Sequence, residues 1–389
     1  ILRNPEYRSR VQKLVQSAFA GKPEDIISQS VAKALYGEVS PYSATRLERF
    51  AACAFAHFLQ YGMKLTERVE YEFKPMDMGN VMHEALESFA EEVRKRGMKW
   101  TELTEQERNE IADRCLDNIV ADYGNTVLKS SARNEYMIER TRRILRRTVW
   151  ALQKQLEQGE FQPEGFEVTF GGGRIDRVDI MEDQNKVYVK VIDYKTGNTS
   201  FDLVYLYHGL QLQLMIYLDG ALRVEQKKYP DKEIIPAGVF YYNIKDPMIQ
   251  EKIDADVEAV SAGLMKELKM NGLVQADPEL VYRMDSSLGS IPVAFNKDGS
   301  FRKNSSVADR TQFAVLGRYV RTKIEKIRSS ILEGDAEVSP YELGKKNACT
   351  YCPYMTVCGF DRRLSGYEFR RLKNFSDEEL WKAFDREAE

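Results

Sequence analysis

The amino-acid sequence predicts an α/β fold in which one block of strands carries helical segments on both sides. The first observation is that apolar residues recur at helical spacing through most of the chain before residue 160. The second is a change, from residue 166, to β-branched and aromatic residues at near-alternate positions. The third is the return of helical patterns after the strands, an order that is typical of one core flanked by helices.

The elements are expected in the following order. A mainly helical stretch at residues 6–36 precedes a helix that Ser43 or Thr45 would cap. Further helices are predicted at 78–97, 104–124 and 133–158, and strands at 166–170, 174–180 and 187–193. Then follow a helix at about 205–223, a strand at 236–244, a hairpin within 291–304 and helices at about 307–333.

The composition indicates an ordinary globular protein. The chain has 389 residues, begins with Ile and is 43% hydrophobic and 30% charged, and we expect it to be part of a longer protein. No apolar run approaches the roughly 20 residues that span a bilayer, and the start shows no signal-peptide pattern, so we expect no membrane contact. The few, clustered cysteines indicate a cytosolic metal site more than disulfides, so we expect a cytoplasmic location. Because the formal net charge is only −3, any binding of nucleic acid must depend on local clusters of charge.

Two carboxylates and a lysine on neighbouring predicted strands form the strongest chemical signal. Asp176 lies in G-R-I-D-R, and Asp193 and Lys195 lie in I-D-Y-K-T-G. Because side chains alternate along a strand, Asp193 and Lys195 project from one face, which Asp176 reaches if the two strands form a hairpin. An isolated D-x-K triplet is more often a set of polar groups at a strand end. Here, however, Asp193 follows an apolar strand, where a buried charge needs compensation such as a metal ion.

These groups suit Mg²⁺ (or Mn²⁺), which prefers oxygen ligands and would lower the pKa of a bound water. Lys195 would orient that water or stabilise the developing negative charge. His83, on an upstream predicted helix, is a further candidate, although a lone helical histidine is more often structural. Gln213 and Tyr217 lie one helical turn apart and therefore share a face of the helix after the strands.

Together these residues resemble the RecB-like branch of the PD-(D/E)xK nuclease superfamily. That branch has a histidine on an upstream helix, then G-x-I-D, D-Y-K-[ST] and Q-x-x-x-Y, which match His83, 173–176, 193–196 and 213–217. The resemblance implies a restriction-endonuclease-like core with a mixed central sheet. It also implies roles for these residues. The metal ligands would be His83, Asp176, Asp193 and the backbone carbonyl of Tyr194, and Lys195 would be the catalytic lysine. Gln213 and Tyr217 would support the site or contact DNA, and Glu167 is a weaker candidate.

The cysteines indicate a second metal site. Cys349, Cys352 and Cys358 form a C-x₂-C-x₅-C segment, and Cys53 lies far upstream. Five cysteines are few for a disulfide scaffold, and four thiolates suit either a [4Fe–4S] cluster or Zn²⁺. Cys115, in a helical stretch, is expected to be an ordinary buried thiol.

This cysteine arrangement is similar to that of the iron–sulfur nucleases of the AddB type, the second subunits of bacterial AddAB helicase–nucleases, which process broken DNA ends for recombination. The likeness extends over about 32–373 and includes A-L-Y-G at 34–37, T-R-L-E at 45–48 and C-G-F-D-R-R-L at 358–364. It favours a [4Fe–4S] cluster on the four cysteines over zinc. One departure is Ala54, where relatives usually have Pro, and this affects local turn geometry more than ligation.

The resemblance implies a helical lead-in at 1–40, a nuclease domain at 41–373 with its strand core at about 160–245, and a tail at 374–389. Cys53 and the segment 349–358 would close the nuclease domain. The implied activity is Mg-dependent exonucleolytic hydrolysis of single-stranded DNA, delivered from unwound duplex ends by a helicase partner of the AddA type. No P-loop pattern occurs, so ATP use is expected elsewhere. The competing hypothesis is a catalytically idle DNA-binding or scaffolding module with a structural metal site.

Two basic clusters are candidate contacts for DNA. Five arginines crowd one predicted helix: Arg140, Arg142, Arg143, Arg146 and Arg147. A second group lies near the C-terminus: Arg362, Arg363, Arg370, Arg371 and Lys373. Each cluster would either neutralise phosphates or form a solvated face paired with acidic residues. Tyr351, Tyr354 and Phe360, beside the cysteines, would either stack on bases or pack in the core.

Overall fold

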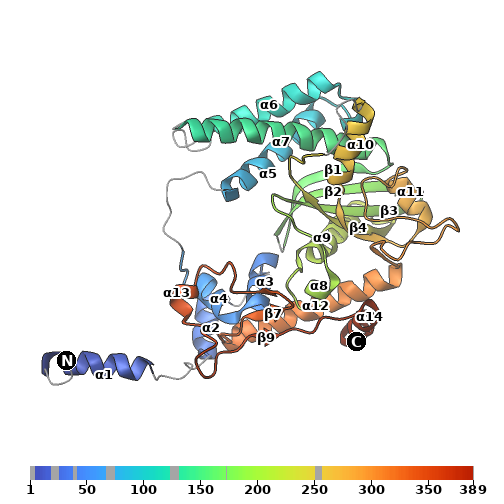
Figure 1. Cartoon of the computed structure of the whole chain (residues 1–389). Helices are drawn as coiled ribbons and strands as arrows, with labels where there is room; N and C mark the ends of the chain where they lie inside the picture. Colours follow the sequence, from blue (N-terminus) through green and yellow to red (C-terminus); the bar gives the residue numbers. More distant parts are fainter. Residues whose placement is uncertain are drawn as a thin grey trace. The chain divides into compact units, whose positions relative to one another are not determined.

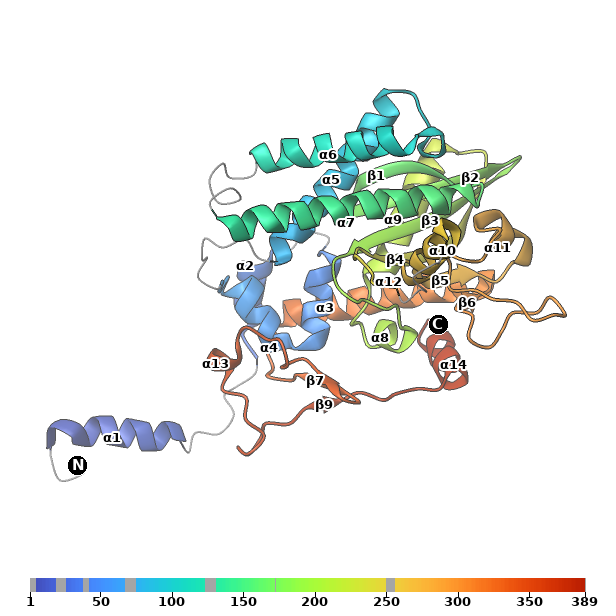
Figure 2. The same ribbon diagram turned by 45° about the horizontal axis from the view of Figure 1, so that its top comes forward.

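The computed structural model describes residues 5–18, 26–37, 42–66, 75–122, 131–171, 173–249 and 256–388 (Figures 1 and 2). The chain divides into two compact units. The strand unit comprises Val69–Leu203, Gln213–Val320 and Ala388–Glu389, and the cysteine unit comprises Ile1–Arg68, Val204–Leu212 and Arg321–Glu387. Among the described helices, none combines the length and the apolar character that a membrane span requires.

A mixed sheet is the centre of the strand unit. Its described strands lie in sequence order and are β1 (Gln162–Phe170), β2 (Gly173–Asp183), β3 (Lys186–Lys195), β4 (Glu233–Asn243), β5 (Asn271–Gln275) and β6 (Val307–Ala308). The pairs β1–β2, β2–β3 and β4–β5 are antiparallel, whereas β3–β4 and β5–β6 are parallel. The prediction of an α/β core with a mixed central sheet is therefore confirmed.

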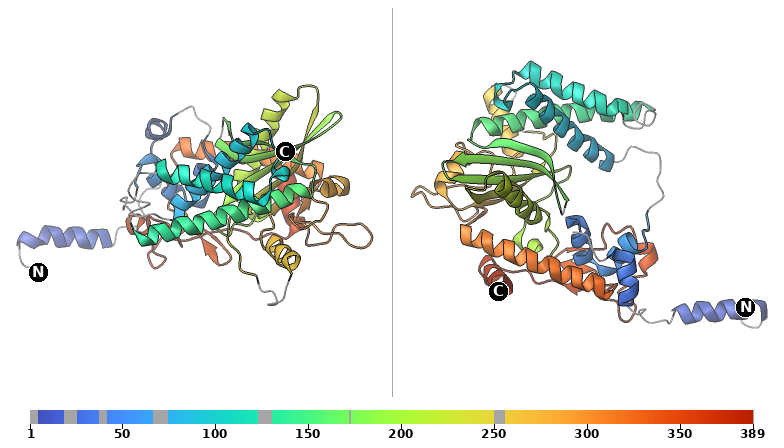
Figure 3. Two further views of the ribbon diagram at one scale, coloured as in Figure 1. Left: turned by 90° about the horizontal axis from the view of Figure 1, so that it is seen from above. Right: turned by 180° about the vertical axis from the view of Figure 1, so that it is seen from behind.

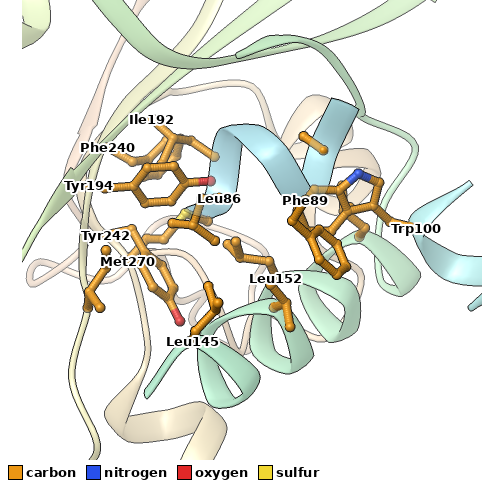
Figure 4. Close-up of a cluster of buried hydrophobic side chains, with 14 of the residues drawn as sticks. Leu86, Phe89, Trp100, Leu145, Leu152, Ile192, Tyr194, Phe240, Tyr242 and Met270 are labelled. Atoms are coloured by element: carbon orange, nitrogen blue, oxygen red, sulfur yellow. The ribbon is translucent and has the colours of Figure 1, made fainter. Parts of the chain in front are cut away.

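Helices cover both faces of this sheet. On one side are α5 (Pro75–Lys95), α6 (Glu105–Asp122) and α7 (Ala132–Glu157), and on the other is α9 (Gln213–Lys228) (Figure 3). Figure 4 shows the core under the first group, where Leu86, Leu145 and Leu152 face Ile192 and Tyr242 of the sheet. The helices repeat every 3.6 residues and the strands every two, and both patterns therefore place apolar side chains in one shared core.

A buried ion network locks β2 to β3 beneath these helices. Asp179 and Lys190 are partners in the strand register, and Lys190 Nζ lies 3.0 Å from Asp179 Oδ2. Arg177 donates to the same carboxylate through Nε, at 2.6 Å, and Nη2, at 3.0 Å. Because Asp179 is completely buried, its two cationic partners provide the compensation that a charge out of water requires.

A glycine allows α9 to approach the opposite face closely. A Cβ atom at Gly220 would lie 2.6 Å from a ring carbon of Phe170 on β1, closer than real side chains pack. The ring of Phe170 also contacts that of Tyr217 edge-on, with ring centroids 5.9 Å apart. The start of α9, which carries Gln213 and Tyr217, is thus held against the sheet.

The cysteine unit consists of helices and a small sheet. Its helices include α2 (Gln29–Tyr36), α3 (Ala44–Ala52), α4 (Ala54–His57), a π-helical turn (Phe58–Gly62), α13 (Met355–Cys358) and α14 (Asp377–Ala388). Its strands are β7 (Tyr341–Leu343), β8 (Lys346–Asn347) and β9 (Arg370–Arg371), in the order β8-β7-β9. The remaining elements of the chain are α1 (Pro5–Ala18), a 3₁₀ turn (Trp100–Glu102), α8 (Leu203–Tyr207), α10 (Val257–Glu267), α11 (Pro278–Met284) and α12 (Arg310–Glu333).

Several predicted elements differ from the structure. The helix expected at about 205–223 is two helices, α8 and α9, separated by a turn at Gly209 with φ of 77°. The hairpin expected within 291–304 has one isolated bridge, between Phe295 and Phe301, and no strands among the described residues. The helix after Ser43, which does cap it, is interrupted at Cys53. Part of the stretch 6–36 and of the glycine turn 171–173 lies outside the described residues.

Candidate active site

Strand register brings the two predicted aspartates to one end of the sheet. Arg177 pairs with Ile192, so the next positions, Asp176 and Asp193, lie opposite each other on neighbouring strands. Both are buried, with exposed fractions of 8% for Asp176 and 1% for Asp193. The backbone N–H of Tyr194 donates to Asp176 Oδ2 at 2.8 Å, which fixes that carboxylate. The hairpin on which the prediction depended is present.

His83 and Glu167 complete a group of possible metal ligands with Asp176. One donor atom from each of the three residues lies within 4.8 Å of the others. His83 Nδ1, from α5, is 3.4 Å from Asp176 Oδ2 and 3.7 Å from Glu167 Oε1. Asp193, also predicted as a ligand, is not a member of this group of side chains, and ligation by the backbone carbonyl of Tyr194 stays a prediction. Glu167, the weaker candidate in the sequence, is thus one of its three members.

Glu167 has a left-handed backbone, with φ of 49°. This conformation is uncommon for a residue with a side chain, and such conformations tend to occur at functional sites. Glu167 also forms an ion pair with Arg174 on β2. No feature of the alternating pattern at 166–170 signals this conformation.

Lys195 is held by a chain of polar contacts that begins at Asp193. Its Nζ lies 2.6 Å from Asp193 Oδ2 and donates a hydrogen bond of 2.7 Å to Gln213 Oε1. Gln213 Nε2 in turn donates to the hydroxyl of Tyr217 at 2.9 Å. The structure therefore brings together Asp193, Lys195, Gln213 and Tyr217 as one connected set.

Two groups of this site, Asp193 and His83, have pKa values well above their usual ones. Burial, reinforced by the charge of Asp176, raises the pKa of Asp193 to about 7, although Lys195 opposes this shift. Burial would lower the pKa of His83, but Asp176 and Glu167 outweigh it and raise that pKa to about 10. The site thus concentrates negative charge that cations must balance.

The donor set fits a hard divalent cation. Its carboxylate oxygens are the ligand type that Mg²⁺ and Mn²⁺ prefer, and the imidazole of His83 adds one nitrogen donor. In addition, Asp193 Oδ1 is buried and has no hydrogen-bond partner among the described residues. A buried oxygen of this kind costs free energy unless an ion or a water molecule satisfies it.

The four predicted metal-binding cysteines also converge, within the cysteine unit. Cys53, Cys349, Cys352 and Cys358 all line one small cavity of about 20 Å³. Burial, followed by the neighbouring thiols, raises the pKa of Cys349 to about 12. The backbone N–H of Phe360 contacts Cys358 Sγ at 3.5 Å. Cys115 lies elsewhere, buried in the apolar core of the strand unit.

The aromatic residues beside the cysteines have different surroundings. Tyr354 is buried and its hydroxyl donates to the carbonyl of Leu65 at 3.0 Å, and Phe360 packs against Phe369. Tyr351, by contrast, is 95% exposed. Core packing therefore accounts for two of the three residues.

The basic clusters are partly neutralised by acidic neighbours. On α7, Arg142 and Arg146 pair with Asp113, and Arg143 pairs with Asp246. Near the C-terminus, Arg363 pairs with Asp361, Arg371 with Glu342 and Lys373 with Glu379. Arg370 donates to the carbonyl of Ala51, and Arg362 lies over the ring of Phe369. No acidic partner of Arg140 or Arg147 occurs among the described residues.

Comparison with known proteins connects this geometry to a family. The family model of the PD-(D/E)XK nuclease superfamily matches residues 41–359. The chain is 42% identical to a protein of Lachnoclostridium phytofermentans and 34% identical to proteins of Alkaliphilus metalliredigens and Clostridium acetobutylicum. These alignments cover 98%, 100% and 99% of this chain and 35%, 36% and 35% of those proteins.

Each of these relatives is named as one subunit of an "ATP-dependent helicase/deoxyribonuclease". The likeness to the AddB type, expected from the cysteines and the flanking motifs, is confirmed. The chain spans about a third of the length of these relatives. The extent of the family match, together with the mixed sheet and its cluster of carboxylates, leads to one conclusion: the chain belongs to the PD-(D/E)XK nuclease superfamily.

Proposed function

We propose that this chain is a Mg²⁺-dependent deoxyribonuclease domain that hydrolyses phosphodiester bonds of single-stranded DNA. The observation that carries the proposal is the meeting of His83, Glu167 and Asp176 within 4.8 Å, beside the pair Asp193–Lys195. A site of this composition combines carboxylates for a divalent ion with a cation for a phosphate oxygen. Such pairing supports phosphodiester hydrolysis more directly than passive DNA binding, which requires no buried carboxylates.

His83, Glu167 and Asp176 would hold the ion, with Asp193 as a neighbouring ligand whose free oxygen is available. A divalent ion there would acidify water and offset the charge of the scissile phosphate. Lys195 would donate a hydrogen bond to the attacking water or to a phosphate oxygen. Gln213 accepts from the same ammonium group and thereby restricts its direction.

The test is cleavage of end-labelled single-stranded DNA by the whole chain, with Mg²⁺ and with EDTA. Asp193→Ala should abolish cleavage while DNA binding in EDTA remains. Lys154→Gln, which removes an ion-paired cation from α7, is the control for a change of charge and should cleave normally. If Asp193→Ala cleaves at the wild-type rate, or if EDTA does not inhibit the wild type, the proposed metal site is contradicted. If the wild type does not cleave in Mg²⁺, the idle scaffolding hypothesis is preferred.

The same proposal includes a [4Fe–4S] cluster on Cys53, Cys349, Cys352 and Cys358. Two observations support it: all four thiols line one cavity, and Arg370, whose guanidinium lies near Cys53, would offset part of the thiolate charge. Backbone N–H groups of Ala56, Ser339 and Phe55 also favour the thiolate form of Cys53, whose pKa burial otherwise raises. Amide donors of this kind are typical of metal-bound thiolates, and zinc is the alternative occupant.

We propose that a helicase supplies the single-stranded DNA. The relatives' name combines a helicase and a deoxyribonuclease, and this chain contains no P-loop. A motor of the AddA type would unwind broken duplex ends and deliver single strands to this domain for recombination, in the cytoplasm. The domain would then cut what the motor separates.

A further inference from the structure

A large cavity in the strand unit is not part of the site described above. It has a volume of about 750 Å³ and lies between α6, α7 and α10. This volume is within the range of roughly 300–1,000 Å³ that is common for small-ligand pockets. Six arginines line it, Arg108, Arg140, Arg142, Arg143, Arg146 and Arg147, against two acidic residues, Glu105 and Glu139.

The charge around this cavity is balanced only in part. Of the acidic partners of the paired arginines, Glu139 lines the cavity, whereas Asp113, Asp117 and Asp246 do not. Within the described part of the chain, Arg140 and Arg147 have no ion-pair partner. Arg147 is instead placed over the ring of Trp150, 5.3 Å from its centroid. The lining therefore has an excess of positive charge that an anion would neutralise.

A buried arginine indicates the same kind of ligand. Arg108 is only 6% exposed, yet its Nε has no hydrogen-bond partner among the described residues. Its Nη1 donates to a neutral group, Gln153 Oε1, at 2.6 Å. Glu105 and Glu157 act on this charge, but no ion pair joins either of them to Arg108 among the described residues. A buried guanidinium N–H without an acceptor is costly, and a phosphate entering the cavity would provide that acceptor.

The cavity also offers surfaces for a base. Trp150 and Tyr136 line it from α7, and Val257, Val260 and Leu264 line it from α10. We infer that this cavity binds one unstacked nucleotide of single-stranded DNA, with its phosphate on Arg108, Arg140 and Arg147 and its base against Trp150. Proteins that bind single strands without sequence preference combine positively charged groups for the backbone with aromatic side chains for the bases.

The inference rests on the proposed function, because single-stranded DNA is also the substrate proposed for the metal centre. It adds a second contact for the strand within the same unit, away from the residues that would cut. Duplex DNA is a poor candidate, since the faces of its paired bases are covered and could not reach Trp150.

Binding is tested with the whole chain in EDTA, so that no cleavage is required. Thymidine monophosphate, inorganic phosphate and a short fluorescein-labelled oligothymidylate are the probes. The double variant Arg140→Gln/Arg147→Gln should bind the oligothymidylate about tenfold more weakly, and the slope of log K against log salt should fall by about 1.4. Trp150→Leu should weaken binding by about fivefold or more and remove the tryptophan quenching that thymidine monophosphate causes.

Lys154→Gln is the matched control, because it removes a cation of α7 that does not line the cavity, and it should bind as the wild type does. Unchanged binding by the arginine and tryptophan variants would overturn the inference. Equal affinity for inorganic phosphate and thymidine monophosphate, without quenching, would also overturn it, because the site would then recognise an anion only. Wild-type cleavage in Mg²⁺ is scored separately. If the wild type does not cleave but the arginine and tryptophan variants bind more weakly, only the proposed nuclease activity is rejected. If the wild type cleaves normally but these variants bind as the wild type does, only the proposed nucleotide site is rejected.

Discussion

At the scale of single residues, Lys195 depends on its neighbours for its position. Its ammonium group is fixed between Asp193 and Gln213, and Gln213 is fixed by the hydroxyl of Tyr217. A group that stabilises charge in a transition state must be oriented beforehand to be effective. The roles of Gln213 and Tyr217 are therefore expected to be positional.

Lys195→Ala should reduce the single-turnover cleavage rate by about 10²–10³-fold, the usual effect of removing one such donor. Tyr217→Phe should reduce it by only about threefold to tenfold, because it removes the hydroxyl that accepts from Gln213 and leaves the ring against Phe170. Both rates are measured on single-stranded DNA at saturating Mg²⁺. A Tyr217→Phe variant as slow as Lys195→Ala would mean that the hydroxyl itself takes part in the reaction.

His57 gives a second prediction at this scale, concerning stability. It is completely buried, accepts a hydrogen bond from Arg46 Nε at 3.1 Å, and packs against Tyr36 and Tyr61. Burial, with the charge of Arg46, lowers its pKa to about 3. Between an unfolded-state pKa of about 6.5 and pH 3, the unfolded chain binds a proton that the folded chain excludes.

The free energy of unfolding should therefore fall as the pH decreases below 6.5, by up to about 1.4 kcal/mol per pH unit from His57 alone. Above that pH the contribution is constant. Denaturant unfolding of the wild type and of His57→Gln, which keeps an acceptor for Arg46, is compared at pH 7.5 and 5.5. An identical loss of stability in both proteins would show that His57 does not cause it.

At the scale of elements, the break between α3 and α4 places Cys53 where it can meet the C-terminal cysteines. Cys53 ends α3 with an extended backbone, at φ of −166° and ψ of 118°, and α4 begins directly after it. Its thiol thereby lines the cavity that Cys349, Cys352 and Cys358 share. A bound cluster would tie this helix break to the short strands β7 and β9.

Cys53→Ser should abolish the broad visible absorption of anaerobically purified protein. It should also raise hydrogen exchange of residues 341–371 by about tenfold or more, because metal ligation contributes directly to folding free energy. Cys115→Ser, a change in the core of the other unit, is the control and should leave both unchanged. If the anaerobically purified wild type is colourless and contains stoichiometric zinc, the iron–sulfur cluster is excluded, but a metal still links the four cysteines. Unchanged exchange in Cys53→Ser would exclude the link itself.

The elements also show how far the sequence could predict the structure. The strands predicted at 166–170, 174–180 and 187–193 lie within β1, β2 and β3, which extend beyond these ranges. These strands and the long helices α5, α6 and α7 were predictable, because their apolar periods are strong and uninterrupted. The break at Cys53 and the division at Gly209 were not, since apolar spacing continues through both and tertiary contacts decide the backbone there. In the site, motif spacing indicated Asp176, Asp193 and Lys195, whereas the place of Glu167 beside His83 and Asp176 depends on tertiary contacts that no local pattern reveals.

At the scale of the whole molecule, the chain is expected to need a partner for duplex DNA. It spans about a third of relatives whose name combines a helicase and a deoxyribonuclease, and it has no P-loop. Opening one terminal base-pair step costs about 1.4 kcal/mol, so blunt duplex should be cut at least about tenfold more slowly than single strands. The measurement compares the two substrates, without ATP, at equal concentration of ends. Equal rates on both would contradict the dependence on a motor.

The convergence of the four cysteines has a consequence for the order of events during synthesis. Cys53 leaves the ribosome about three hundred residues before Cys358, with the whole sheet encoded between them. At a translation rate of about 5–20 residues per second, Cys53 waits roughly 15–60 seconds for its partners. The sheet and its carboxylate site can form in that interval, but the cavity that the four thiols share cannot. Metal can therefore bind there only after nearly all of the chain has been translated. Bound metal would distinguish the molecules in which the segment of Cys53 has packed against that of Cys349, Cys352 and Cys358.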